Sequence, residues 1–100
     1  MDRFDEMFKR VSWMKPVDSA ILSVLEPGYW MSPNNISKNS GYQNRYVGTR
    51  CQELHRRGLL EREANGDPFY RLTELGQQVS KRELSPEDVE KLTHIEEDEE

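Results

Sequence analysis

The sequence contains few of the residues that many classes of function require. It has one cysteine and two histidines among 100 residues, so no disulfide can form within the chain and soft metal ligands are scarce. No apolar run approaches the roughly 20 residues needed to cross a bilayer. The first ten residues, MDRFDEMFKR, lack the apolar segment of a signal peptide. We therefore expect a cytoplasmic protein with no membrane segment.

Catalytic patterns are equally scarce. The chain has no glycine-rich loop that could hold a phosphate, and no arrangement of Ser/His/Asp or Cys/His/Asn is evident. Cys51 and His55 have the i, i+4 spacing of two metal ligands on one helical face, but the only other histidine is His94. A buried Cys51 and a His55 at the rim of the core explain the pair better. We expect no enzymatic activity, no metal, no cofactor and no small-molecule effector.

Charge is distributed unevenly along the chain. The formal net charge is −5, which is unusual for a protein that binds nucleic acid. Residues 85–100, however, hold eight carboxylates against one lysine, whereas residues 41–58 hold four arginines against one glutamate. The acidity lies mainly in a C-terminal segment, and the positive charge lies in the middle of the chain.

The middle of the chain has the layout of a winged helix-turn-helix. Ser32-Pro33 is a strong helix start, and Ser40-Gly41 supplies a turn. A second helix then covers residues 42–57, with Val47, Cys51 and Leu54 facing inward and Gly58 as its C-cap. Two short strands within residues 59–72 follow, joined by a turn at Asn65-Gly66. The predicted fold class is therefore mainly α with a small β-hairpin.

Further helices flank this unit. Residues 1–12 form an amphipathic helix with Phe4, Met7, Phe8 and Val11 on one stripe, and residues 13–84 form the winged helix-turn-helix domain. Thr73 caps a helix that is predicted to reach about Leu84. Ser85-Pro86 begins a last helix within residues 85–95, and residues 96–100 form a disordered acidic tail.

The outward side of the helix at 42–57 carries side chains that can read base edges. Gln and Asn can pair with adenine, Arg with guanine, and the Thr methyl group with thymine. Arginines and an asparagine of the hairpin could reach the DNA backbone. The predicted DNA-binding residues are Ser40, Gln43, Asn44, Arg45, Tyr46, Thr49, Arg50, Arg62, Asn65 and Arg71.

Structural interpretations compete for several of these residues. Any one of the helix residues could simply belong to a solvated polar face. Ser40 could serve the turn, and Tyr42 could anchor the helix. Arg62 or Arg71 could pair across the hairpin with Glu61 or Glu63.

The segment from Trp13 to Leu84 resembles the phage-repressor-like winged-helix family of halophilic archaea. The resemblance rests on W-M-K-P-V-D at 13–18, Y-V-x-x-R-C-x-E-L at 46–54, G-L-L-E at 58–61 and Y-R-L-T-E-L-G at 70–76. It implies a transcriptional regulator with Tyr46 and Arg50 on the recognition helix. A halophilic source would also account for five lysines against nineteen acidic residues.

The sequence therefore predicts a sequence-specific DNA-binding regulator, expected to act as a repressor, with double-stranded DNA as its partner. The alternative is a winged-helix module that binds another protein and not DNA. A homodimer is predicted to form through Phe4, Met7, Phe8, Val11, Val89 and Leu92. The competing prediction is that both terminal helices fold back onto the core of the monomer.

Overall fold

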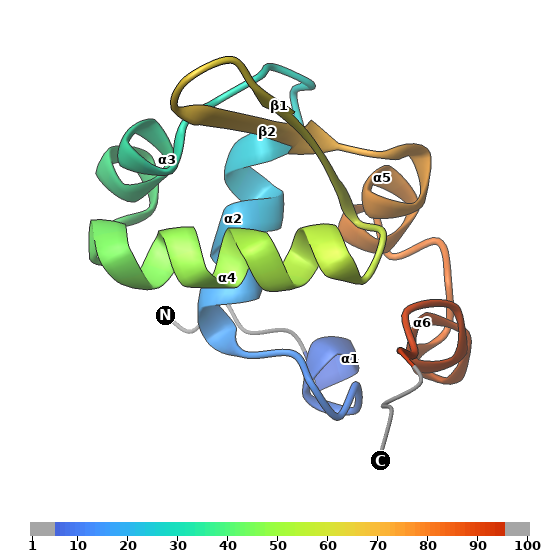
Figure 1. Cartoon of the computed structure of the whole chain (residues 1–100). Coiled ribbons are helices and arrows are strands. Elements are labelled where there is room, and N and C mark those ends of the chain that lie inside the picture. Colours follow the sequence, from blue (N-terminus) through green and yellow to red (C-terminus); the bar gives the residue numbers. More distant parts are fainter. Residues whose placement is uncertain (1–5, 96–100) are drawn as a thin grey trace, which may run out of the picture.

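The computed structural model describes residues 6–95, and within them it confirms the predicted fold class (Figure 1). Short helix α1 (Glu6–Lys9) is followed by α2 (Pro16–Leu25), α3 (Pro33–Ser40) and α4 (Asn44–Arg56). The antiparallel strands β1 (Leu60–Ala64) and β2 (Pro68–Leu72) come next, and α5 (Glu74–Ser80) and α6 (Pro86–Leu92) complete the fold. No helix among these residues combines the length and the apolar character that crossing a membrane requires.

The predicted helix caps explain most element boundaries. Ser32 accepts a hydrogen bond from the Asn35 N–H at 3.2 Å, and Ser85 accepts one from the Asp88 N–H at 3.1 Å. Gly41 ends α3 in the left-handed region at φ 83°, which produces the sharp turn into α4. Each serine thus satisfies one of the free N–H groups in the first turn of its helix and marks where that helix begins.

The prediction that the helix after Thr73 reaches Leu84 was wrong. The helix α5 ends at Ser80, because Arg82 adopts a left-handed conformation at φ 59°. The Glu83 N–H donates to the Gln78 carbonyl at 2.9 Å, and the Arg82 N–H donates to the Val79 carbonyl at 3.1 Å. This pair of bonds is the Schellman ending, which usually has glycine at the left-handed position. An arginine there gave no sequence signal for the end of the helix.

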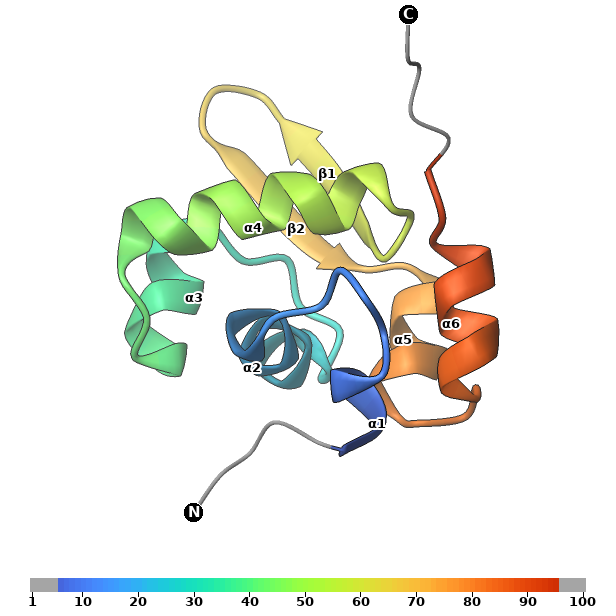
Figure 2. The same cartoon turned by 90° about the horizontal axis from the view of Figure 1, so that it is seen from below.

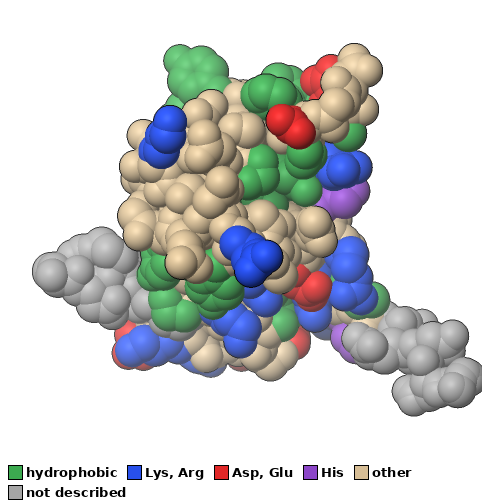
Figure 3. Space-filling view, turned by 60° about the vertical axis from the view of Figure 1, so that its left-hand side comes forward, with side chains coloured by type: hydrophobic (Ala, Val, Ile, Leu, Met, Phe, Trp, Pro, Cys, Tyr) green, Lys and Arg blue, Asp and Glu red, His purple; other side chains and the backbone are tan. Residues whose placement is uncertain are grey.

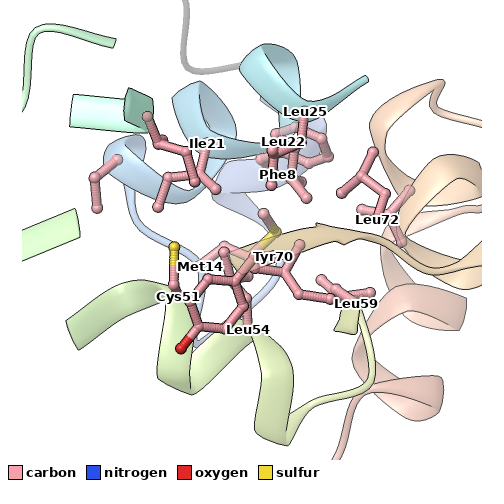
Figure 4. Packing of buried hydrophobic residues seen from close by; sticks show 14 of the residues in the cluster. Phe8, Met14, Ile21, Leu22, Leu25, Cys51, Leu54, Leu59, Tyr70 and Leu72 are labelled. Atoms are coloured by element: carbon pink, nitrogen blue, oxygen red, sulfur yellow. The ribbon is translucent and has the colours of Figure 1, made fainter. Parts of the chain in front are cut away.

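One hydrophobic core holds α2, α4 and the hairpin together with the segments that precede and follow them. Buried side chains from α2, α4 and β2 pack against one another, including Leu22, Leu54 and Tyr70 (Figure 4). Phe8 and Val11 near the N-terminus, and Val89 in α6, are each exposed by 1% or less. Figure 2 shows α1 lying beside α5 and α6. The terminal helices therefore fold back onto the core of the monomer, as the competing prediction stated.

This burial corrects the predicted dimer surface. Phe8, Val11 and Val89 face the interior of the monomer and cannot meet a second copy in this fold. Leu92 is 54% exposed and is the one predicted dimer residue in the described chain that the structure places at the surface. Phe4, the Met7 side chain and the predicted tail at 96–100 lie outside the described residues.

Candidate nucleic-acid interface

Helix α4 has one buried side and one exposed side. Val47, Cys51 and Leu54 are each 0% exposed, which confirms the predicted inward stripe. Burial and the nearby charge of Asp18 raise the pKa of the Cys51 thiol to about 12. The thiol is therefore an inert part of the core.

The exposed N-terminal part of α4 and its cap present the predicted base-reading side chains. We call this surface the reading face, and its residues are Gln43, Asn44, Arg45, Tyr46 and Thr49. Figure 3 views the molecule from the side that includes α3 and shows a surface made mostly of backbone and of side chains that are neither hydrophobic nor charged, with separate basic groups. Such a surface offers hydrogen-bond donors and acceptors more than positive charge.

Local contacts hold parts of the reading face in place. The Thr49 hydroxyl donates to the Arg45 carbonyl at 3.1 Å, so the methyl group is left for outside contacts. The Asn44 amide donates to the Asn34 side-chain oxygen at 3.4 Å, which links α4 to α3. Tyr46 is 40% exposed and meets Tyr42 edge-on, with ring centroids 6.3 Å apart. Tyr42 packs against the core, in keeping with its predicted anchoring role.

Arg50 does not belong to the reading face, and its predicted contact with a base needs correction. Its Nε donates to Oδ1 of Asp18 at 2.9 Å, and its Nη2 donates to Oδ2 at 2.7 Å. The same Nη2 donates to the Trp13 carbonyl at 3.3 Å. The Arg50 side chain is 12% exposed and the Asp18 side chain 0%. The hydrogen bond to Asp18 raises the pKa of the Arg50 guanidinium, against the opposite effect of burial.

A signal for this role was present in the sequence. Arg50 lies three residues after Val47 and four before Leu54, which places it on the same helical stripe as the buried residues. A charged residue at such a position needs a buried partner of opposite charge. Asp18 is that partner, and it also accepts from the Lys15 N–H at 3.0 Å at the start of α2.

Arg56 in the last turn of α4 and Arg57 at its C-cap are also paired. Glu53 binds Arg57 at 2.6 Å and Arg56 at 3.0 Å. Burial alone would raise the pKa of Glu53, but the hydrogen bonds and charges of Arg57 and Arg56 lower it overall. The Arg57 guanidinium also stacks 4.6 Å from the Trp13 ring centroid. Among the four arginines of residues 41–58, Arg45 alone has no ion-pair partner within residues 6–95.

The remaining predicted DNA-binding residues lie in the turn before α4 and in the hairpin. Ser40 accepts from the Tyr42 N–H at 3.3 Å and so serves the turn. Arg71 donates to Glu61 directly across the hairpin at 3.1 Å. It therefore has the structural role that was the alternative to a DNA contact. Arg62 and Asn65 are exposed, and in the described part of the chain neither side chain has a hydrogen-bond or ionic partner. These two are the hairpin side chains that remain available to a partner.

His55 has a structural contact as well. Its Nδ1 lies 2.9 Å from the Leu60 carbonyl, and its ring meets Tyr70 edge-on. Across residues 6–95, no three His, Cys, Asp or Glu side chains are grouped so that they could hold a metal ion.

Comparison with known proteins places this geometry in a family. Residues 7–92 match the winged helix-turn-helix phage repressor family. The chain belongs to this family. Over 88 residues it is 41% identical to the repressor protein of Halobacterium phage phiH, which covers 85% of this chain and 99% of the phage protein. The family expected from the sequence is therefore confirmed.

Solved structures show the same fold at low sequence identity. BpsR of Bordetella bronchiseptica matches with a TM-score of 0.67 and 18% identity, over 87% of this chain and 67% of BpsR. MarR of E. coli matches with a TM-score of 0.64 and 19% identity, over 87% and 68% of the two chains. A MarR family transcriptional regulator of Silicibacter pomeroyi matches with a TM-score of 0.64 and 20% identity, over 73% of this chain and 54% of that regulator.

The buried ion pair yields a test of stability. We expect Asp18→Asn to lower the free energy of unfolding by about 3–5 kcal/mol, because Arg50 then stays buried without a charged partner. Glu61→Gln is the matched control, since it removes a half-exposed partner from Arg71 and should cost about 1 kcal/mol or less. Denaturant unfolding followed by circular dichroism measures both changes. Equal small losses for the two variants would contradict the anchoring role of Asp18.

Proposed function

We propose that this protein is a transcriptional repressor that binds double-stranded DNA in a sequence-specific manner. The reading face enters the major groove, and Arg62 and Asn65 of the hairpin contact the DNA backbone. The observation that carries the proposal is the division of α4, whose N-terminal side chains are exposed while Arg50 and Arg57 bind it to the rest of the fold. Membership of the phage repressor family supports it.

Each residue of the reading face has a chemical role in this proposal. Gln43 and Asn44 can pair with adenine, and Arg45 can donate to guanine or to a phosphate. The Thr49 methyl group can pack on a thymine methyl group, and the Tyr46 hydroxyl can donate to a phosphate. The protein then acts in the cytoplasm, where the DNA of an archaeal cell lies.

The modest positive charge of this surface agrees with binding in high salt. At about 1 M salt the Debye length is about 3 Å, so long-range attraction between a basic surface and phosphates is largely lost. Direct hydrogen bonds to base edges depend less on such attraction. A related repressor comes from a phage of Halobacterium, which fits a protein adapted to concentrated salt.

A homodimer remains part of the proposal, with a smaller surface than the sequence predicted. Leu92 lies on α6, and Glu90 and Lys91 of the same helix line an open hollow of about 590 Å³ with Arg10 of the N-terminal segment. A dimer would read two half-sites about 34–36 Å apart. Footprinting of a selected duplex should show two protected segments at that spacing, and Leu92→Glu should reduce the protection to one segment. A single protected segment for the unchanged protein would contradict the dimer.

The function is tested by selecting binding sequences from random duplexes in potassium chloride and measuring affinity for the best one by fluorescence anisotropy. Arg45→Ala should weaken that complex by about 1–3 kcal/mol and relax the preference at one base pair. Arg62→Ala should weaken binding to all duplexes alike and lower the salt slope by about 1.

Lys81→Ala is the control, because it removes an exposed cation at the C-cap of α5, outside the reading face, the hairpin and the proposed dimer surface. It should leave DNA affinity unchanged. Failure to enrich any sequence, or equal effects of Arg45→Ala and Lys81→Ala, would favour a protein-interaction module over a DNA-binding regulator.

A further inference from the structure

The two faces of the hairpin differ in composition and in burial. Strand pairing places Leu60 opposite Leu72 on the inner face, where both residues are buried. Side chains alternate between the two faces of a strand, so the pairs Glu61–Arg71 and Glu63–Phe69 lie on the outer face. Figure 1 shows the helices gathered on the inner side of the hairpin. No helix of residues 6–95 covers the outer face, and the α2–α3 connection contacts it through Trp30.

This outer face contains a small hollow beside an aromatic residue from the α2–α3 connection. Paired backbone hydrogen bonds between Met31 and Tyr70, at 2.8 and 2.9 Å, hold the connection against β2. The hollow has a volume of about 290 Å³, and we call its lining the outer wing site, formed by Trp30, Glu63, Asn65, Asp67 and Phe69. Figure 3 shows hydrophobic and acidic side chains next to each other near the upper edge of the molecule.

The charges of the outer wing site are unbalanced. Within residues 6–95, neither Glu63 nor Asp67 has an ionic or hydrogen-bond partner for its carboxylate. Arg71, the nearby cation of the outer face, is already neutralised by Glu61 at 3.1 Å. Phe69 is 41% exposed, which is a large apolar exposure for a position on a strand. Two free carboxylates beside aromatic rings attract a cation that has flat, weakly hydrated faces.

The molecule itself shows that this surface can stack a guanidinium group. The Arg71 Cζ atom lies 4.6 Å from the centroid of the Trp30 ring while its Nε binds Glu61. The outer wing site adds two further carboxylates, Glu63 and Asp67, and a second ring, Phe69, around one hollow with Trp30. The negative charge disfavours nucleic acid at this face.

We propose that the outer wing site docks an arginine side chain of a partner protein. Its volume of about 290 Å³ lies just below the roughly 300–1,000 Å³ range of ligand pockets, which suits one side chain better than a larger molecule. Arginine fits better than lysine, because a planar guanidinium stacks on rings and donates to two carboxylates at once. Glu63 and Phe69 lie on the opposite face of the hairpin from Arg62, so the recognition of arginine does not use the proposed DNA contact of Arg62, and Asn65 is the one residue that both proposals share.

Nuclear magnetic resonance offers a direct test, because the chain has only two tryptophans and their indole N–H signals are easily separated. The probe is the tripeptide acetyl-Gly-Arg-Gly-amide, titrated into the labelled full chain at a salt concentration at which it is folded. The Trp30 indole signal should shift in a saturable way. The Trp13 indole, which donates to the Thr93 hydroxyl at 2.8 Å on the other side of the molecule, should not shift.

Variants and matched probes complete the test. Glu63→Gln/Asp67→Asn should weaken peptide binding about tenfold or more. Glu74→Gln/Glu83→Gln removes two exposed carboxylates elsewhere and should leave binding unchanged. Phe69→Leu keeps the apolar surface and removes the ring, and it should weaken binding severalfold. All five substituted positions are at the surface, so the variants should fold, which circular dichroism checks.

Three results would overturn the proposal. Equal binding of a citrulline peptide would show that the positive charge is not recognised. Equal or tighter binding of tetramethylammonium would assign the site to a free organic cation. A saturable shift of the Trp30 indole by duplex DNA, with none by the arginine peptide, would assign the outer face to nucleic acid.

Discussion

The buried ion pair between Asp18 and Arg50 is the interaction on which the rest of the structure depends. It joins the start of α2 to the middle of α4 through two hydrogen bonds of 2.9 and 2.7 Å. A third bond, to the Trp13 carbonyl, ties the preceding loop to the same guanidinium. Buried pairs are screened by salt much less than exposed ones, so this anchor persists in concentrated salt. Trp13, Asp18 and Arg50 are also among the residues on which the family resemblance rests.

Further contacts join the C-terminal end of α4 to the loop before α2 and to the end of α6. Arg57 donates to the Thr93 carbonyl at 3.1 Å and stacks on Trp13, and the Trp13 indole donates to the Thr93 hydroxyl. Ser12 donates to Glu90 through both its N–H and its hydroxyl, and these bonds lower the pKa of Glu90. The middle and C-terminal end of α4 are thus fixed to the fold, while its N-terminal end projects the reading face.

Local signals in the sequence predicted most of the fold. Ser-Pro pairs, Gly58 and Asn65-Gly66 act within a few residues, so their consequences can be read without knowing the tertiary structure. The site was predicted less well, because the role of Arg50 depends on Asp18, which lies 32 residues earlier in the chain. The same limit applies to Phe8 and Val89. An apolar stripe shows that a helix is covered, but it cannot show whether its own core or a second copy covers it.

The central claim is that the exposed N-terminal part of α4 is the surface that meets DNA. Chemical-shift mapping of the labelled protein against its selected duplex tests this claim most directly. The account predicts that the largest shifts fall on residues 43–49, with smaller shifts at Arg62 and Asn65 and little change at the Arg50 side chain. Shifts concentrated on α6 around Leu92, with residues 43–49 unmoved, would contradict it.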